Sequence, residues 1–328
     1  MKVVQIGLGP IGIAISRLLL KKPGWEIVGA VDIDPAKQGR DLGEVAGLAR
    51  RLGIVVRGQL LDVYTPDIDV AFLTTVSTFP EVLPTLEALI RAGIDVVAST
   101  EELFFPHYRY ADQAQTLDAL AKHHGVSILG TGINPGFIMD TLVLILTGVC
   151  QQVTRIAATR VMNASGHRPS LHKRLGIGLS PETFADEATH HRVGLIGVVD
   201  SVAFLAHVLQ WRMDDVKERF VPVIAEKPLP PTHPQVAPGQ VCGIRHIVKG
   251  ITQGKEAISL DLRMYLEAEN ARDTIYIEGI PTLESTMKST DMGDTAAAAL
   301  LVNMSPLVRQ ARAGLLTMVD LPLPHFQR

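Results

Sequence analysis

The segment Gly7-Leu8-Gly9-Pro10-Ile11-Gly12 constrains the fold of this chain more than any other. It directly follows an apolar run, Val3–Ile6, and opens a helical run, Ile11–Leu20. In such a strand–turn–helix unit the first glycine permits a tight turn, the second lets the backbone approach a pyrophosphate, and the third lets helix and strand pack closely. The helix N-terminus offers free N–H groups to the phosphates. The segment therefore predicts a dinucleotide site that includes Gly7, Gly9, Pro10, Ile11 and Gly12.

Asp32 directly follows the second apolar run, Ile27–Val31, and stands 20 residues after Gly12. A carboxylate at this position accepts hydrogen bonds from the adenosine ribose hydroxyls and repels a 2′-phosphate, which favours NAD. Lys37 and Arg40 lie in the following loop and could reach a 2′-phosphate. We therefore expect NAD as the cofactor and leave NADP open.

The first part of the chain alternates short β-branched runs with helical stretches. Most of these runs are apolar on both faces, as parallel strands covered by helices are. The alternation predicts an α/β fold with a Rossmann-type, doubly wound parallel sheet. The expected strands are Val3–Ile6, Ile27–Val31, Ile54–Val56, Val70–Leu73, Val96–Ala98 and Val126–Leu129, and the expected helices are Ile11–Leu20, Pro80–Ala92 and Tyr108–His124.

The pattern changes after Asn134-Pro135-Gly136, where it predicts an α+β domain with an open, largely antiparallel sheet and helices on one face. A late helix, Asp294–Arg312, has Gly314 as its expected stop and is expected to pack back on the first domain. We expect a NAD(P)-binding domain of residues 1–135 completed by 290–328, and a substrate-binding and dimerisation domain of residues 136–289. The second domain's expected strands are Val153–Met162, Val241–Ile251, Ala257–Glu267 and Thr274–Glu278, its helices are Ile138–Thr147, Pro181–His191 and Val198–Trp211, and its loops are 166–180 and 227–238.

Charge and composition exclude several classes of protein. The chain has 31 Lys+Arg and 34 Asp+Glu, a net charge of −3, so it supplies no field for binding nucleic acid. Its apolar runs are too interrupted for a membrane span, which needs about 18 residues. Two cysteines, Cys150 and Cys242, cannot build a disulfide framework, and no Cys/His cluster has metal-ligand spacing. We expect a cytoplasmic protein with no metal, membrane or nucleic-acid partner.

Two adjacent acids, Glu101 and Glu102, follow the expected fifth strand after Ser99 and Thr100. Ligands of doubly wound sheets bind beyond the carboxyl ends of the strands, so these acids would lie near the nicotinamide. The alternative is that they only favour the dipole of a following short helix, which is worth about 0.3–1 kcal/mol. Their position alone leaves both alternatives open.

A second glycine-rich segment, Gly130–Phe137, follows the expected sixth strand. Its glycines suit a backbone packed against a cofactor, and the Asn134 carboxamide has both a donor and an acceptor. The alternative is a hinge at which the chain crosses between domains, and the two interpretations are compatible.

Motifs along nearly the whole chain match one known family in order and spacing. They are the GLGPIG turn, Val31-Asp32 with Pro35 and Lys37, Asp41–Glu44, Ser99–Glu102 with Pro106, Gly132–Phe137, Arg160 with Asn163–Ser165, Lys173–Gly178, Gly293–Ala296 and Gly314–Met318. Together they resemble the 2,4-diaminopentanoate dehydrogenases, close relatives of the native amine dehydrogenases with a nucleotide domain like that of dihydrodipicolinate reductase. No single motif is decisive, but their arrangement is specific.

The resemblance implies an NAD(P)-dependent oxidoreductase that deaminates an amine oxidatively and, in reverse, aminates a ketone with ammonia. The family's catalytic acid is a glutamate of the Glu-Glu segment, which we place at Glu102 with Glu101 as the alternative. A carboxylate can hold ammonium and move protons while carbinolamine becomes iminium. The expected cofactor-binding residues also include Thr75, Ser99, Thr100 and Asn134, and the expected substrate-binding residues are Asn134, Pro135, Phe137, Arg160, Asn163 and Leu195.

Two departures from the family pattern concern the substrate. Asn163 stands where relatives carry Asp before Ala-Ser, and Leu195 stands where many carry a pocket histidine. The apolar replacement favours a plainer, more apolar amine or ketone than the diamine. Arg160 could hold a substrate carboxylate or belong to a solvated basic face. Subunits of such enzymes pair through the exposed face of the second sheet, so we expect a homodimer.

Two other functions compete with this interpretation. His190-His191 invites comparison with the paired histidines of dihydrodipicolinate reductase, an imine reductase, but that enzyme's Lys-x-Asp-x-Pro-Ser-Gly-Thr-Ala run is missing here. The simpler interpretation of these histidines is as polar groups at a helix end. The second alternative is a non-catalytic NAD(P)-binding sensor, against which the paired acids argue.

Overall fold

The chain folds into two compact units, Met1–Phe137 with Asp291–Arg328, and Ile138–Thr290. The structure, a computed structural model, describes residues 1–327 apart from 168, 231–235 and 289–292. The chain leaves the first unit after Phe137 and returns to it for a late helix and strand, so the second unit is an insertion into the first.

The first unit is built on a sheet of seven described strands, in the order β13-β6-β5-β4-β1-β2-β3, and every pair is parallel. Because β1 pairs with β2 on one side and with β4 on the other, the direction of winding reverses beside β1. Ligands of such sheets bind beyond the strand ends at this reversal. The strands are β1 (Lys2–Ile6), β2 (Glu26–Val31), β3 (Val56–Arg57), β4 (Val70–Leu73), β5 (Asp95–Ala98), β6 (Ser127–Gly130) and β13 (Gly314–Leu316).

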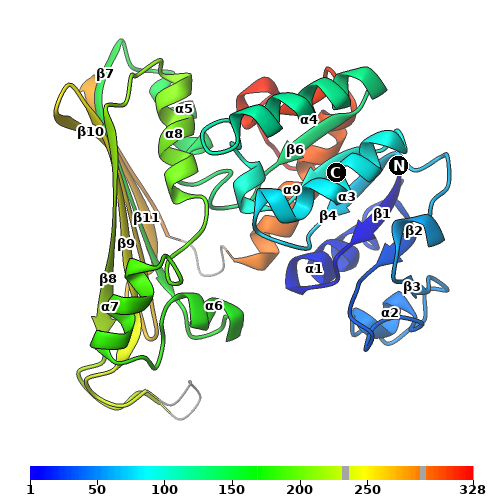
Figure 1. The fold of residues 1–328 in the computed structure, drawn as a ribbon, viewed down its shortest axis with the longest axis horizontal. Helices are drawn as coiled ribbons and strands as arrows, with labels where there is room; N and C mark the ends of the chain where they lie inside the picture. Colours follow the sequence, from blue (N-terminus) through cyan, green and yellow to red (C-terminus); the bar gives the residue numbers. More distant parts are fainter. Residues whose placement is uncertain (168, 231–235, 289–292, 328) are drawn as a thin grey trace. The chain divides into compact units, whose positions relative to one another are not determined.

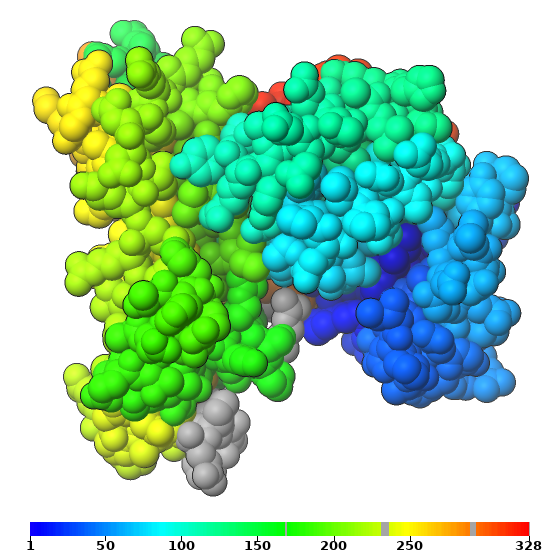
Figure 2. Space-filling model, in the orientation of Figure 1, coloured from blue at the N-terminus to red at the C-terminus, as the bar shows by residue number. Residues whose placement is uncertain are grey.

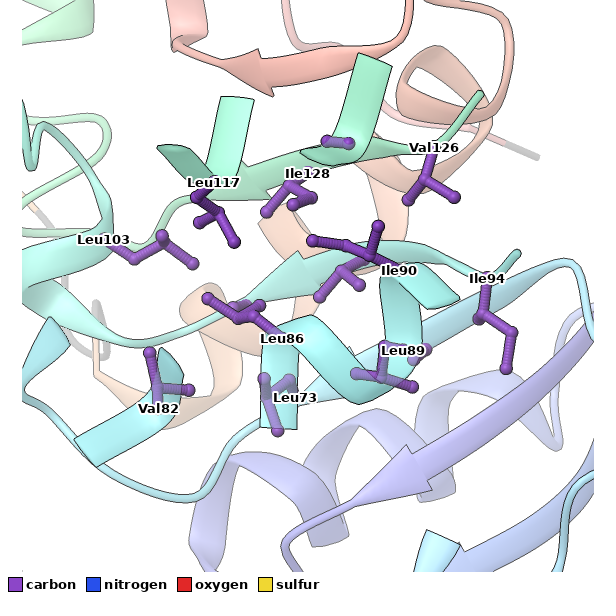
Figure 3. Packing of buried hydrophobic residues seen from close by; sticks show 14 of the residues in the cluster. Leu73, Val82, Leu86, Leu89, Ile90, Ile94, Leu103, Leu117, Val126 and Ile128 are labelled. Atoms are coloured by element: carbon purple, nitrogen blue, oxygen red, sulfur yellow. The ribbon is translucent and has the colours of Figure 1, made fainter. Parts of the chain in front are cut away.

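Helices cover both faces of this sheet, which confirms the doubly wound fold (Figure 1). On one face, apolar side chains of α3 (Phe79–Arg91) and α4 (Ala111–His124) pack with alternate strand residues such as Leu73 and Ile128 (Figure 3). On the other face, α1 (Pro10–Leu19) packs against α9 (Asp294–Arg309). The expected return of the late helix to the first part of the chain is therefore observed. Shorter helical elements are α2 (Leu42–Val45), η1 (Leu60–Asp62), η2 (Glu101–Leu103) and η3 (Met318–Asp320).

The second unit contains a mixed sheet in the order β12-β11-β7-β10-β9-β8. Its pairs are antiparallel except β7 with β10, which confirms the expected open, largely antiparallel sheet. The strands are β7 (Gln152–Asn163), β8 (Asp215–Ile224), β9 (Val241–Thr252), β10 (Lys255–Tyr265), β11 (Arg272–Ile280) and β12 (Leu283–Met287).

One face of the second sheet is covered and the other is open. Helix α8 (Val198–Val208) packs on β9 and β10, and α7 (Pro181–Thr189) packs on β8. Figure 1 shows these helices on the same side of the sheet as α5 (Thr141–Thr147) and α6 (Pro169–Arg174). No helix of the described residues covers the opposite face. None of the helices within the described ranges is long and apolar enough to span a membrane.

The structure corrects several expected elements. Strands β8 and β12 were not expected, since both lie at sheet edges, where the exposed half of the side chains is charged or polar and obscures the apolar pattern. Gly314 opens strand β13 instead of only stopping a helix, because α9 already ends at Arg309. The expected loop 166–180 contains the short helix α6. The expected loop 227–238 and the expected domain boundary at residue 290 fall partly outside the described residues.

Candidate active site

The glycine turn after β1 has the shape that a dinucleotide requires. Gly7 has a φ of +87°, and a Cβ there would lie 2.5 Å from the Thr74 carbonyl oxygen. A Cβ at Gly12 would lie 2.0 Å from the Gly7 carbonyl oxygen, so helix and turn touch backbone to backbone. At Gly9, the N-cap of α1, a Cβ would meet no described atom within 4 Å. The turn is therefore closed on its protein side and open where the pyrophosphate would lie, beside the helix N-terminus.

Two polar side chains that the sequence analysis missed hold this turn in place. Gln5 is fully buried in β1, and its Nε2 donates to the Gly7 carbonyl oxygen at 2.9 Å. The Thr74 hydroxyl donates to the same oxygen at 2.8 Å. The signal was a glutamine in an otherwise apolar buried strand, because a buried amide needs partners and marks a place where the backbone must be fixed.

Asp32 lies at the carboxyl end of β2 and is already hydrogen-bonded by the protein. Its Oδ2 accepts from the Leu8 amide at 2.7 Å and from Lys37 Nζ at 3.0 Å, while its Oδ1 accepts from the Asp34 amide at 2.9 Å. Burial opposes the charged form, but these hydrogen bonds outweigh it and hold the pKa of Asp32 below its ordinary value. Arg40 instead approaches Glu44 at 3.9 Å. Of the two expected cations, Lys37 is the one in contact with Asp32.

In Figure 2 the dark blue N-terminal segment is set back between light blue and cyan parts of the first unit. These bordering parts follow β2 and β4, on the two sides of β1. Thr75, expected to contact the cofactor, is exposed directly after β4, and its Cγ2 lies 3.0 Å from where a Gly7 Cβ would be. The expected cofactor residues of β1, β2 and β4 therefore share one end of the sheet.

Hydrogen bonds join the segments that follow β4 and β5, and close packing brings β6 beside them. The Thr100 hydroxyl donates to the Val76 carbonyl oxygen at 2.8 Å, and the Glu102 amide donates to the Ser77 carbonyl oxygen at 3.1 Å. A Cβ at Gly130 would lie 2.4 Å from the Leu103 carbonyl carbon, so only glycine lets β6 approach the η2 turn this closely. The structure thus brings the Ser99–Glu102 segment beside the start of the Gly130–Phe137 segment.

The two glutamates of this segment have different surroundings. Glu102 is 8% exposed, and its Oε2 accepts from the Phe79 amide at 2.8 Å and from the Tyr110 hydroxyl at 2.9 Å. Phe79 is the first residue of α3, so this carboxylate satisfies a helix N-terminus. The alternative that a carboxylate of this pair only stabilises a helix N-terminus therefore applies to Glu102. The helix that it stabilises is α3, not the short helix that follows in sequence. Glu101 is partly exposed at the start of η2.

Asn134 carries the clearest sign of a missing partner in the first unit. Both its Oδ1 and its Nδ2 are buried, and neither has a hydrogen-bond partner among the described residues. Leaving a buried polar group unpaired costs about 1–3 kcal/mol, so a group with both a donor and an acceptor would fit here. Pro135 is buried and Phe137 partly buried in the same segment. At Gly136, φ is +131° and a Cβ would lie 2.2 Å from the Gly132 amide nitrogen, so this turn is closed on itself.

The remaining expected substrate residues belong to the second unit. Arg160 is 2% exposed in β7 and lies 3.5 Å from Asp273 of β11, so the alternative of a solvated basic face is wrong. Burial lowers the pKa of the Arg160 guanidinium, and the nearby charge of Asp273 opposes this shift. Burial also raises the pKa of the Asp273 carboxyl. Asn163 Oδ1 accepts from the Ser165 amide at 2.9 Å. The Leu195 amide donates to Nδ1 of buried His246 at 3.2 Å, a partner that the sequence analysis missed.

His190 and His191 lie at the exposed end of α7. His190 is the C-cap residue, and its Nδ1 lies 2.9 Å from the Asp186 carbonyl oxygen. His191 Nδ1 lies 3.3 Å from Glu218. These contacts fit the interpretation of polar groups at a helix end.

Known proteins resemble this chain over nearly its whole length. The model of the 2,4-diaminopentanoate dehydrogenase C-terminal domain matches residues 137–327. A 2,4-diaminopentanoate dehydrogenase from Acetoanaerobium sticklandii is 32% identical over 98% of this chain and 94% of its own length. An amine dehydrogenase from Streptomyces virginiae is 22% identical over 97% of this chain and 95% of its own.

Solved structures extend the similarity to the fold of the whole chain. The structure of an amine dehydrogenase from Mycobacterium smegmatis superposes with a TM-score of 0.87 at 24% identity, over 100% of this chain and 97% of that one. The family model covers more than half of the chain, and the 32% identical relative covers almost all of it. The chain therefore belongs to the 2,4-diaminopentanoate dehydrogenase family.

Proposed function

We propose that this protein is an amine dehydrogenase that interconverts an amine, water and NAD with a ketone, ammonia, NADH and a proton. The observation that carries the proposal is the pair Glu101–Glu102, fixed by hydrogen bonds at the ends of β4 and β5 in a dinucleotide-binding unit. The 32% identity to a 2,4-diaminopentanoate dehydrogenase over nearly the whole chain supports the same reaction class.

The dinucleotide would lie across the carboxyl ends of β1, β2 and β4. The open backbone at Gly9 and the N-terminus of α1 would hold the pyrophosphate, and Asp32 would hold the adenosine ribose. The orphaned Asn134 carboxamide follows β6, on the side of β1 opposite to β2, where the nicotinamide half would lie. When bound, the nicotinamide supplies or accepts the hydride. We propose NAD over NADP because Asp32 keeps its negative charge at the ribose position.

The residues of this chain would handle protons and orientation. A carboxylate of the Glu101–Glu102 pair would hold ammonium, take a proton as ammonia attacks the carbonyl carbon, and return one as hydroxide leaves as water. The same negative charge would stabilise the cationic iminium. Asn134, Pro135 and Phe137 remain proposed substrate-binding residues of the first unit, and Arg160, Asn163 and Leu195 remain those of the second.

The proposed substrate is a plainer amine than the 2,4-diaminopentanoate named for the relative. Leu195 offers no side-chain hydrogen bond to a second amino group, and Asn163 already accepts from the Ser165 amide. Arg160, paired with Asp273, remains the candidate for a substrate carboxylate. A small, largely apolar ketone with ammonia is therefore the expected reductive pair.

We further propose that the protein works as a cytoplasmic homodimer. The open face of the second sheet carries partly buried side chains from four adjacent strands, including Ala157, Ile247, Ser259 and Tyr276. A second copy of this face would cover them. Both cysteines are free, which fits a reducing compartment.

A panel of amines with NAD and NADP, and of ketones with ammonia and the reduced cofactors, tests this function through absorbance of the reduced nicotinamide. Turnover of at least one small apolar amine, faster with NAD, is the expected result. Turnover of a cyclic imine without ammonia would instead indicate an imine reductase. Tight NAD binding without turnover of any member of the panel would indicate a sensor.

A further inference from the structure

The imidazole of His246, on β9 of the second unit, is 0% exposed and has a partner at each ring nitrogen. Its Nδ1 lies 3.2 Å from the Leu195 amide nitrogen, and its Nε2 lies 2.9 Å from Oε1 of Glu218 on β8. A buried ring with both nitrogens satisfied keeps one orientation, because turning it would leave both partners unpaired. We call His246 and Glu218 together the histidine anchor.

The Leu195 contact determines which nitrogen of His246 carries the hydrogen. A backbone amide can only donate, so Nδ1 accepts from Leu195 through its lone pair. Nε2 therefore carries the hydrogen and donates it to the Glu218 carboxylate. The other oxygen of this carboxylate lies 3.3 Å from Nδ1 of exposed His191. Glu218 thus selects the tautomer of His246 that can accept from a backbone amide.

The segment before α8 is held at two adjacent residues. Gly194 has a φ of +105°, and a Cβ there would lie 2.3 Å from Cε1 of Phe220, so its backbone packs directly on this ring. The Gly194 amide donates to the Arg174 carbonyl oxygen at 2.8 Å. The next amide along the chain is that of Leu195, which donates to His246. The histidine anchor therefore sets the position of Leu195 on a backbone that is already fixed at Gly194.

The side chain of Leu195 is only partly buried. It packs against an apolar cluster that includes Phe184, Ile244 and Met264. Apolar side chains of this kind form the walls of small-molecule sites. One methylene in such a site changes the specificity of an enzyme by about 10- to 200-fold, so a small displacement of the wall changes which substrate fits.

We infer that His246, oriented by Glu218, is a positioning residue for substrate specificity, which fixes the Leu195 backbone and so the wall that Leu195 presents to the amine. This inference rests on the proposed amine dehydrogenase function and on the proposed place of Leu195 in the substrate site. It assigns roles to His246 and Glu218, which no sequence motif indicated.

Two substitutions of His246 separate its two nitrogens. His246→Asn keeps a carboxamide oxygen at the distance of Nδ1, so it can accept from the Leu195 amide but does not reach Glu218. His246→Gln reaches Glu218 and leaves the Leu195 amide without an acceptor. His123→Gln, on an exposed residue of α4, is the control. The assays are kcat and KM for isopropylamine and sec-butylamine, or for another active pair that differs by one methylene, and NAD affinity by calorimetry.

We expect His246→Gln to raise the KM for the amine by about threefold to tenfold, while kcat and NAD affinity stay within about twofold. The ratio of kcat/KM between the two amines should change by at least about threefold. His246→Asn should keep the wild-type KM and ratio, because it restores the acceptor, and His123→Gln should match the wild type. The double variant Leu195→Ala/His246→Gln should have the ratio of Leu195→Ala, because His246 acts through Leu195.

Glu218→Ala supplies a second test, which also applies if His246→Gln does not fold. Without the carboxylate the tautomer of His246 is no longer selected, so the KM should rise and the ratio should change in the same direction as in His246→Gln. An unchanged KM and ratio in both variants would overturn the specificity role. Equal losses in His246→Asn and His246→Gln would also overturn it, because the effect would then not depend on the Leu195 amide.

Amide hydrogen exchange of residues 193–197, measured by mass spectrometry, tests the anchor without turnover. We expect exchange at least about fivefold faster in His246→Gln than in the wild type, and His246→Asn close to the wild type. A wild type that turns over no amine would refute the proposed function and the specificity role with it, and the exchange rates would still judge the anchor. Equal exchange in the wild type and His246→Gln would overturn the anchor itself.

Discussion

Single residues at the glycine turn divide into those that shape the protein and those that leave room for a ligand. Gly12 is in van der Waals contact with the turn, and Gly9 borders open space. Asp32 links the turn to the end of β2 through the Leu8 amide. Sequence pattern identified all three, because a fixed spacing between a strand and a helix leaves few ways to bind a pyrophosphate.

Replacing Gly12 and Gly9 separately by alanine should separate folding from binding. Gly12→Ala places a Cβ 2.0 Å from the Gly7 carbonyl oxygen, so we expect a destabilisation of about 1–3 kcal/mol. Gly9→Ala meets no described protein atom, so its melting temperature should hold while NAD affinity falls, because the methyl group occupies the pyrophosphate position. Thermal melting and calorimetric titration measure the two effects. Equal melting temperatures would contradict the packing argument.

Asp32→Ala should weaken NAD binding by about tenfold or more, because it removes the charged acceptor for the ribose hydroxyls. It should improve NADP relative to NAD, since one repulsion is lost. Dissociation constants for both cofactors measure the change. Asp34→Ala is the control, because Asp34 is partly exposed, lies 3.7 Å from the same Lys37 and accepts from the Ala36 amide in its own loop. A large native preference for NADP would refute the electrostatic argument and assign control of the site to Lys37.

Other residue roles were not readable from the sequence. Glu101 and Glu102 are neighbours with the same side chain, and only the position of α3, 23 residues earlier, distinguishes them. The orphaned carboxamide of Asn134 was expected to be polar and close to the cofactor, but its lack of a partner is a property of packing. The role of Gln5 likewise depends on Thr74, which directly follows the neighbouring strand β4.

At the scale of elements, the buried strands were the most predictable part of the chain. Strands β1, β2 and β4 to β6 lie inside a sheet covered on both faces, so continuous apolar runs marked them within one or two residues. Strand β8 was missed because Lys217, Glu218 and Arg219 occupy consecutive positions of an edge strand. Strand β13 has only three residues, too few to show a period. An apolar pattern reveals a strand through its burial, and β8 is only partly buried while β13 is very short.

The central strands of the second sheet carry an ion cluster that makes stability depend on pH. Asp261 of β10 accepts from Arg245 of β9 at 2.8 Å and from Arg263 of its own strand at 2.7 Å. Burial opposes the charged form of Asp261, but the two arginines outweigh it and hold the pKa of Asp261 below its ordinary value. A lowered pKa stabilises the fold above the unfolded pKa, about 3.9, and this contribution is lost as pH falls through the folded pKa.

Asp261→Asn should therefore lower the melting temperature at pH 7 by about 2–4 °C. The difference from the wild type should shrink steadily below about pH 4 and vanish once the wild-type carboxyl is protonated. Melting curves from pH 7 to pH 2.5 measure this convergence. An unchanged difference at the lowest pH would show that the cluster acts through packing and not through charge.

At the scale of the whole molecule, the proposed homodimer depends on the open face of the second sheet. Ile247 lies opposite Asp261 of β10 in a row across this face. Ile247→Glu would place two carboxylates opposite each other and remove apolar area, so we expect it to convert a dimer into a monomer. Light scattering after size exclusion measures the mass. Leu61→Glu, on an 82% exposed residue of the first unit, is the control. A wild type that is monomeric at micromolar concentration would contradict the proposal.

The insertion of the second unit into the first governs the order in which this protein can mature on the ribosome. Residues 138–290 are contiguous and can fold as soon as they emerge, but the sheet of the first unit waits for β13, and the face of that sheet waits for α9. At typical elongation rates this interval lasts roughly 10–40 s. During that time β6 presents an unpaired edge and the strands beneath α9 present apolar surface. The nascent N-terminal half is thus expected to need chaperone binding most in the interval before α9 and β13 have been synthesised.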